Sequence, residues 1–134
     1  MGNGTTKSSH SIHSLSYHLI QCVTGRRKIF DNNEVIDLLK TQIYNISKNF
    51  EVEVLSIDPD KDYFHMTFKS KPTLEIPKYL NAIKCITSRE IQRNFPELKN
   101  GALWAPSYFL STSGQVTLET LNDYVNTQRK TKTK

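Results

Sequence analysis

Apolar and polar side chains alternate most clearly over residues 62–68, which read DYFHMTF. Successive side chains of a strand point to opposite faces of a sheet, so the pattern predicts a strand with Phe64, Met66 and Phe68 buried. The opposite, more polar face is expected to carry Tyr63, His65 and Thr67. An imidazole on a rigid strand is suited to binding a metal ion or a phosphate, although outward-facing polar residues of antiparallel sheets are commonly only solvated.

The same alternation predicts strands over residues 15–24, 50–57 and 103–112, and a turn over residues 58–61 joins the second of these to the strand at 62–68. Apolar residues at three- and four-residue spacing predict two long helices. One runs from capping residues at 31–33 to Asn49, and the other from Thr73 to Phe95. A third, shorter helix is predicted over residues 117–128.

The order strand, helix, strand, strand, helix, strand is that of the split βαβ, or ferredoxin-like, arrangement. We therefore predict an α+β fold, with an antiparallel sheet, two helices on one face and an extra C-terminal helix. Three helical turns are too few to be stable alone, so the helix over 117–128 must dock on the rest of the chain. Its expected place is the open sheet face that carries Tyr63, His65 and Thr67.

The net charge of the 134-residue chain is +5, which suggests a polyanionic partner. The charge is concentrated at the termini: four basic residues lie in the last six positions and Lys7 adds a fifth, so residues 8–128 are neutral overall. A polyanion site must therefore come from local clusters. The sharpest cluster in the body comprises Arg26, Arg27 and Lys28, for which a solvated turn is the alternative interpretation.

The length of the chain favours one domain over residues 15–128, between a Ser/Thr/Gly-rich arm at 1–14 and a basic tail at 129–134. The sequence contains no apolar run of about 18 residues, so we expect no membrane segment and a cytoplasmic protein. Cys22 and Cys85 do not have a metal-binding or redox spacing, and a disulfide is not expected.

Tyr124 and Gln128 are four residues apart on the third predicted helix, so their side chains lie one above the other. If that helix docks on the open sheet face, a phenol, a carboxamide and the imidazole of His65 come together. These groups could form a nucleophile beside a metal ion that polarises a phosphate. Simple packing of Tyr124 is the alternative at this point.

Several short motifs, in this order and spacing, resemble those of the small TnpA-type single-tyrosine transposases of insertion sequences. These transposases belong to the HUH endonuclease superfamily and are related to the REP-associated tyrosine transposases. The motifs span about residues 17–128. They are Tyr17-His18, Arg26-Arg27-Lys28, Asp62-Tyr63-Phe64-His65, Phe95-Pro96-Glu97-Leu98-Lys99, Leu103-Trp104-Ala105-Pro106-Ser107-Tyr108-Phe109, Ser111-Thr112-Ser113-Gly114 and Tyr124-Val125-Asn126-Thr127-Gln128.

The resemblance implies a metal-dependent transposase that cuts and rejoins single-stranded DNA. Tyr124 would be the nucleophile and form a 5′-phosphotyrosine, and a divalent ion, Mg²⁺ or Mn²⁺, would be held by His65, Gln128 and the residue at position 63. The resemblance also implies recognition of subterminal DNA hairpins and a homodimer. The last helix would be exchanged between subunits about a hinge at Gly114.

The chain departs from the family pattern at the first histidine of the HUH motif, where it has Tyr63. A neutral phenol is a poorer metal ligand than imidazole, so a catalytically impaired or domesticated hairpin-binding protein is a second hypothesis. In either case the expected DNA contacts are the basic cluster at 26–28 and stacking on Trp104 or Tyr108. An RNA-binding domain on the same scaffold is a weaker third option, because Tyr17 and Tyr63 are few aromatic residues for such a surface.

Overall fold

The computed structural model of the protein describes residues 15–112 and 122–127. The first of these ranges contains four strands and two long helices, which alternate as a ferredoxin-like domain requires. In chain order they are β1 (Leu15–Val23), α2 (Asn33–Asn49), β2 (Glu53–Asp60), β3 (Tyr63–Ser70), α3 (Ile76–Asn94) and β4 (Trp104–Thr112). Short 3₁₀ turns at Thr24–Arg26, Ile29–Asp31 and Pro96–Leu98 connect them.

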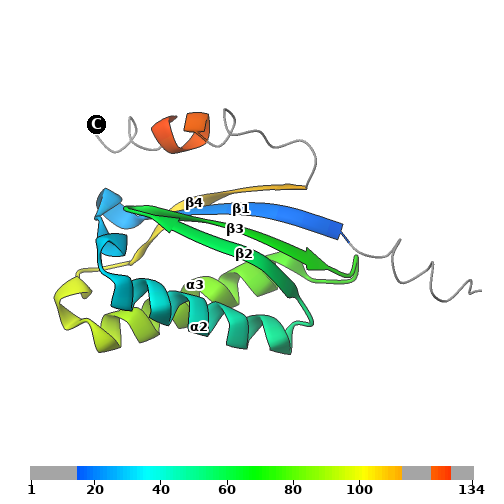
Figure 1. The fold of residues 1–134 in the computed structure, drawn as a ribbon, viewed down its shortest axis with the longest axis horizontal. Coiled ribbons are helices and arrows are strands. Elements are labelled where there is room, and N and C mark those ends of the chain that lie inside the picture. Colours follow the sequence, from blue (N-terminus) through cyan, green and yellow to red (C-terminus); the bar gives the residue numbers. More distant parts are fainter. Residues whose placement is uncertain (1–14, 113–121, 128–134) are drawn as a thin grey trace, which may run out of the picture.

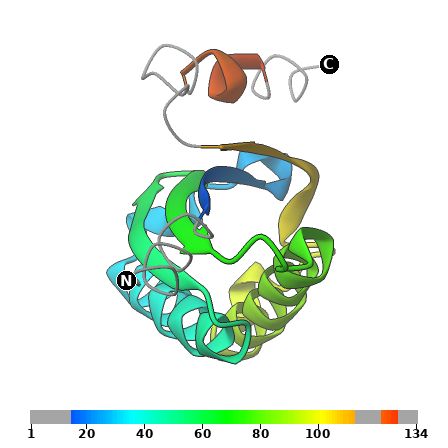
Figure 2. The same ribbon diagram turned by 90° about the vertical axis from the view of Figure 1, so that its right-hand side faces the viewer.

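The strands form one sheet in the order β2-β3-β1-β4, and each neighbouring pair is antiparallel. Helices α2 and α3 cover one face of this sheet (Figure 1). A short helix at residues 122–127 lies over the opposite face, as the second view also shows (Figure 2). The predicted α+β, ferredoxin-like fold with an extra C-terminal helix is thus confirmed.

The core lies between the sheet and the two long helices. Phe64, Met66 and Phe68 of β3 are fully buried in it, as the alternation predicts. The ring of Phe64 packs against Trp104 of β4 and the ring of Phe68 against Tyr79 of α3, with a centroid separation of 5.3 Å in each pair. Burial of these large side chains is the main favourable contribution to folding.

Helix α2 begins where the sequence predicts, because the side chain of Asn32 accepts a hydrogen bond of 2.8 Å from the backbone N–H of Glu34. Helix α3 begins later than expected, at Ile76 instead of Thr73, and Pro77 occupies its first turn. Proline is favoured there since the first turn has no use for its missing N–H. Both helices pack an apolar side against the sheet, so this face of the sheet is the buried one.

The hairpin between β2 and β3 differs from the prediction. The expected turn at 58–61 lies one step further on, at residues 61–62, and Pro59 belongs to β2, opposite Phe64. Proline is tolerated because β2 is an edge strand, where one side of the backbone needs no ladder partner. Lys61 makes the tight turn with a φ of 53°. The strand that carries His65 therefore begins at Tyr63, immediately after the turn.

The predicted third helix is described only at residues 122–127. Gly114, Thr117, Leu118, Leu121 and Gln128, together with the arm at 1–14 and the tail at 129–134, lie outside the described residues. Within the described part of the chain, no helix is both long and apolar enough to cross a membrane.

Candidate nucleophile and metal site

His65 lies near the middle of the sheet face opposite α2 and α3. In the register, Ile20 of β1 is its direct partner on one side and Asp58 of β2 on the other. Two residues before Ile20, His18 shares this face, and its Nδ1 lies 3.0 Å from His65 Nε2. The ring planes are only 11° apart, with centroids separated by 5.2 Å. The two imidazoles thus face each other with a single hydrogen bond between their nitrogens.

The surroundings of His65 favour its neutral form. Burial lowers the pKa of His65 below its ordinary value, the neighbouring His18 lowers it further, and Asp58 acts in the opposite direction. A neutral imidazole has one nitrogen with an available lone pair, which is the form that binds a metal ion. His65 is therefore prepared to act as a ligand at neutral pH.

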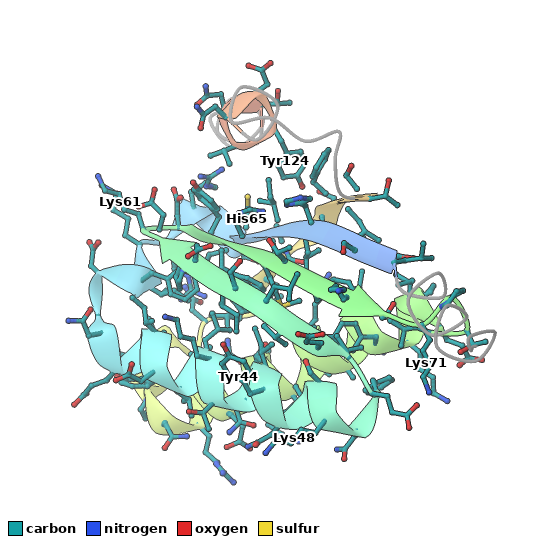
Figure 3. All side chains as sticks on the ribbon, turned by 45° about the vertical axis from the view of Figure 1, so that its right-hand side comes forward. Tyr44, Lys48, Lys61, His65, Lys71 and Tyr124 are labelled. Carbon is teal, nitrogen blue, oxygen red and sulfur yellow. The ribbon has the colours of Figure 1, made fainter. Side chains whose placement is uncertain are left out.

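Tyr124 is brought to this face by the helix at residues 122–127. Val125 of that helix is 4% exposed, and its carbonyl oxygen accepts a hydrogen bond of 3.3 Å from Arg26 Nη1. The ring of Tyr124 packs against Phe109 of β4 at a centroid distance of 5.3 Å. Figure 3 shows Tyr124 extending from the helix toward the sheet face on which His65 lies.

The hydroxyl of Tyr124 is buried, and the described residues offer it no hydrogen bond of full geometry. Burial raises the pKa of Tyr124, and Cys22 adds to this shift. Ser107 and Arg26 lower the pKa in part, so both lie close to the hydroxyl although Ser107 does not reach hydrogen-bond geometry. A buried hydroxyl with a raised pKa needs a base or a nearby cation to become nucleophilic.

Arg26, which the sequence suggests as a DNA contact, has a structural role. Its side chain is 9% exposed and forms a buried ion pair with Asp62, with Nη2 and Oδ1 2.7 Å apart. The angles at this contact are poor for a hydrogen bond, whereas Nε donates to Oδ2 at 3.1 Å with good geometry. Because Arg26 also binds the carbonyl of Val125, it ties the β2–β3 turn to the C-terminal helix.

The other predicted DNA contacts are distributed over different parts of the surface. Arg27 donates to the carbonyl of Leu98 at 3.1 Å, and Lys28 is exposed. Tyr108 is 39% exposed at the edge of the sheet, and its register partner Gln21 belongs to the helix-covered face. Tyr108 therefore lies on the other side of the sheet from His65.

Trp104 has no ring face open for a DNA base to stack on, contrary to the expectation from the sequence. It is 5% exposed, packs against Phe30 and Phe64, and donates from Nε1 to Thr87 Oγ1 at 2.9 Å. This buried hydrogen bond shows how the indole is satisfied inside the core. Trp104 stabilises the start of β4.

A divalent ion needs several donor atoms, and the described residues provide some of them. Among these residues no group of three or more His, Cys, Asp or Glu side chains is arranged to hold a metal ion. The face nevertheless presents the imidazoles of His65 and His18, with half-buried Tyr63 two residues before His65. Imidazole nitrogens are metal donors, so this set fits a divalent ion that takes its remaining ligands from other groups or water.

Two features of the site do not follow from the sequence pattern. The first is the contact between His18 and His65, and the second is the Arg26–Asp62 ion pair. His18 is placed on the same face as Ile20 and Cys22 by the alternation of β1, but the alternation carries no information on the register between β1 and β3. Once the partner of Ile20 is known to be His65, the histidine contact follows.

Comparison with known proteins gives the family. Residues 11–128 match the family described as Transposase IS200 like. The chain is 31% identical over 121 residues to the ISDra2 transposase TnpA of Deinococcus radiodurans, covering 87% of this chain and 86% of that protein. A solved structure of a protein from D. radiodurans R1, described as a transposase, has a TM-score of 0.79 at 29% identity and covers 86% of this chain and 91% of that one.

The structure of a REP-associated tyrosine transposase bound to a REP hairpin has the same fold. Its TM-score is 0.58 at 11% identity, over 84% of this chain and 61% of that one. The family match extends over almost all of the chain, and the sequence identity to the ISDra2 transposase covers most of both proteins. The chain therefore belongs to the IS200-like family of transposases.

Proposed function

We propose that this transposase cuts and rejoins single-stranded DNA at the ends of an insertion sequence, with Tyr124 as the nucleophile. The observation that carries the proposal is the buried Tyr124 hydroxyl, held by a docked helix on the sheet face that carries His65. A merely structural tyrosine in such a position would be expected to complete its hydrogen bonds. Among the described residues the hydroxyl has only the incomplete contact with Ser107, which suits a group whose partner is the substrate.

In the cleavage step, the phenolic oxygen of Tyr124 attacks a backbone phosphorus. A phosphorus–oxygen bond to tyrosine forms as the bond to the 3′-oxygen breaks. The proton lost by the phenol is balanced by the proton that the 3′-oxygen gains, so the products are a 5′-phosphotyrosine and a free 3′-hydroxyl. Attack by a 3′-hydroxyl on that linkage reverses the chemistry and rejoins the strand without an external energy source.

The raised pKa of Tyr124 has to be offset during this step. Arg26 lies close enough to lower that pKa, and its positive charge favours the developing phenolate. We propose that His65, Gln128 and position 63 hold Mg²⁺ or Mn²⁺; such an ion, when bound, polarises the scissile phosphate. The neutral form of His65 that its surroundings favour suits this role.

For the DNA partner we propose a single strand with a hairpin near the element's end, as the bound REP hairpin of the structural relative suggests. Lys28, Arg27 and the tail at 129–134 would contact phosphates, and Tyr108 offers an exposed ring for stacking. A further basic groove of about 390 Å³ is lined by Arg89, Gln92, Arg93, Pro96 and Lys99. It provides a second surface to which a duplex stem could bind.

We also propose that one domain at 15–128 forms a homodimer in which the C-terminal helices are exchanged. The short helix at 122–127 depends on the sheet for its stability. The same docking is possible on a partner subunit's sheet if Gly114 acts as a hinge. With cysteines at positions 109 and 124, a disulfide that joins two chains would report exchanged helices.

The test uses single-stranded DNA carrying the element's own end, with a bridging phosphorothiolate that traps the phosphotyrosine. With Mn²⁺, wild type should form a covalent adduct that is absent with EDTA and absent in Tyr124→Phe. The matched control Tyr44→Phe removes a hydroxyl from an exposed tyrosine of α2, away from this face, and should still form the adduct. An adduct in Tyr124→Phe at the wild-type level would contradict the proposal.

The substitution of Tyr63 for a histidine supports a second candidate, a hairpin-binding protein with impaired cleavage. It predicts salt-dependent binding to hairpin DNA by wild type and Tyr124→Phe alike, without an adduct. If Tyr63→His forms the adduct and wild type does not, this second function describes the natural chain.

A further inference from the structure

His18 is the residue of the site to which the family pattern assigns no role, and its ring is hydrogen-bonded to that of His65. The two side chains come from neighbouring strands in the middle of the sheet, β1 and β3. Ile20 is directly opposite His65, so His18 is its diagonal neighbour on the same face. The central position of both strands holds the two imidazoles in place more firmly than a loop would.

The spacing of the two imidazoles matches that of two ligands on one ion. His18 Nδ1 and His65 Nε2 are 3.0 Å apart. Metal–nitrogen bonds to histidine are about 2.1 Å for zinc, and two such bonds at a right angle place their nitrogens about 3.0 Å apart. At this separation the two nitrogens share one hydrogen, since two neutral imidazoles can form an N–H···N bond.

We propose that His18 supplies the second imidazole of the divalent-metal site, in place of the first histidine of the HUH pattern, where this chain has Tyr63. This inference rests on the proposed function, which requires a metal beside Tyr124. Of the described residues, His18 and His65 would hold the ion. Tyr63 would then line the site without being a required ligand.

The number of protons released when the metal binds distinguishes this ligand set from one that uses Tyr63. To bind the ion, the imidazole that donates the N–H···N bond shifts its proton to its other ring nitrogen, and both rings rotate so that their lone pairs converge. Neither ring loses a proton in this rearrangement, so binding through two imidazoles releases no net proton. A phenol has an ordinary pKa near 10, so binding through its oxygen as phenolate releases about one proton per ion.

Mn²⁺ titration calorimetry of the full chain, in two buffers of different ionisation enthalpy at pH 8, measures both affinity and released protons. We expect less than half a proton released by wild type. His18→Asn should weaken Mn²⁺ binding about tenfold or more, as should His65→Asn, whereas Tyr63→Phe should retain the wild-type affinity. The matched control is Ser111→Ala, which alters the direct register partner of His18 without removing an imidazole.

Electron spin echo measurements on bound Mn²⁺ give a count of ligating histidine nitrogens that does not depend on cleavage. Wild type should show two and His18→Asn one. Thermal unfolding of each variant verifies that it is folded, and His18→Asn combined with Tyr63→His should recover the affinity by returning an imidazole to the family position. That recovery distinguishes a lost ligand from a damaged sheet.

The outcomes separate this inference from the proposed function. If wild type binds Mn²⁺ with one histidine nitrogen and His18→Asn binds it equally well, His18 is not a ligand, while the function of Tyr124 is unaffected. If binding by wild type releases a full proton and Tyr63→Phe abolishes it, Tyr63 is the ligand and the inference is overturned. If wild type binds no Mn²⁺ with or without DNA, both the inference and the metal-dependent function fail.

Discussion

Single charged residues tie together the elements that form the sheet face carrying His65. Arg26 is the clearest case, because one guanidinium serves a carboxylate from the β2–β3 turn and a carbonyl from the C-terminal helix. It adopts this position with a left-handed backbone, at a φ of 55°. A non-glycine residue in that region is uncommon and is retained where its contacts compensate for the strain.

Breaking this ion pair should be costly because it is buried. Asp62→Asn leaves the Arg26 charge without its counterion, and we expect the free energy of unfolding to fall by about 3–5 kcal/mol in urea denaturation. Replacing both residues, as Arg26→Met with Asp62→Leu, should cost less than the sum of the single changes. The exposed pair Lys71–Glu51, 3.3 Å apart, is the control: Lys71→Met should change stability by less than about 1 kcal/mol. Equal losses at the two pairs would contradict this role.

Tyr79 should make the fold sensitive to alkali. Burial raises the pKa of Tyr79 from 10.0 to about 12, although its hydrogen bond with Ser47, 2.6 Å long, acts in the other direction. The unfolded chain loses this proton first, so the contribution is present below pH 10 and is lost between pH 10 and 12. The full effect is about 2.7 kcal/mol, and about half is lost by pH 11.

Urea denaturation between pH 8 and pH 11 measures this dependence. Tyr79→Phe serves as the reference, since it keeps the ring and removes the titrating hydroxyl. It is expected to be less stable at pH 8, where Ser47 loses its partner, but its stability should fall less steeply above pH 10. Parallel curves for the two proteins would show that Tyr79 does not control the alkaline limb.

At the scale of elements, the alternation of apolar and polar side chains predicts which residues of a strand are buried. The buried set Phe64, Met66 and Phe68 follows from the period of two alone. The predicted turn at 58–61 differs from the observed turn because Pro59 is typical of turns. Pro59 is acceptable within β2 only because β2 is an edge strand. The contact of His18 with His65 depends on pairing between distant strands, which local patterns do not encode.

The helix at residues 122–127 is the element whose stability depends most on docking. A helix this short does not form alone, and Val125 is its buried contact with the sheet side. Val125→Asp should remove about 1.5 kcal/mol or more of apolar burial, so hydrogen exchange of the amides at 122–127 should rise more than tenfold. The sheet core should keep its protection.

The matched control for that experiment is Asn122→Asp, which adds the same charge at an exposed position of the same helix. It should leave the exchange of residues 122–127 within a factor of about two of wild type. If both variants exchange alike, Val125 does not hold the helix against the sheet. If Val125→Asp unfolds the whole sheet, the helix is part of the cooperative core.

Considered as a whole molecule, the protein carries its excess positive charge at its ends. The net charge of +5 is accounted for by Lys7 and the basic residues of 129–134, so DNA binding should not resemble that of a uniformly basic surface. Deleting residues 129–134 should reduce the salt dependence of single-strand binding by up to about 3 in the slope of log K against log salt. Lys28→Ala should reduce it by about 0.7.

Fluorescence anisotropy with labelled single-stranded DNA at several salt concentrations measures these slopes. Glu97→Gln removes an exposed negative charge and is the control, with a slope expected to remain within error of wild type. A tail deletion that leaves the slope unchanged would locate the phosphate contacts within the folded domain.

The central claim is that the chemistry resides on Tyr124, over the face that carries His65. The most direct measurement is mass spectrometry of the trapped adduct after nuclease trimming and proteolysis. We expect one peptide, containing Tyr124, whose mass is increased by the 5′-phosphorylated nucleotide remnant. A remnant attached to any other residue, with Tyr124 unmodified, would contradict it.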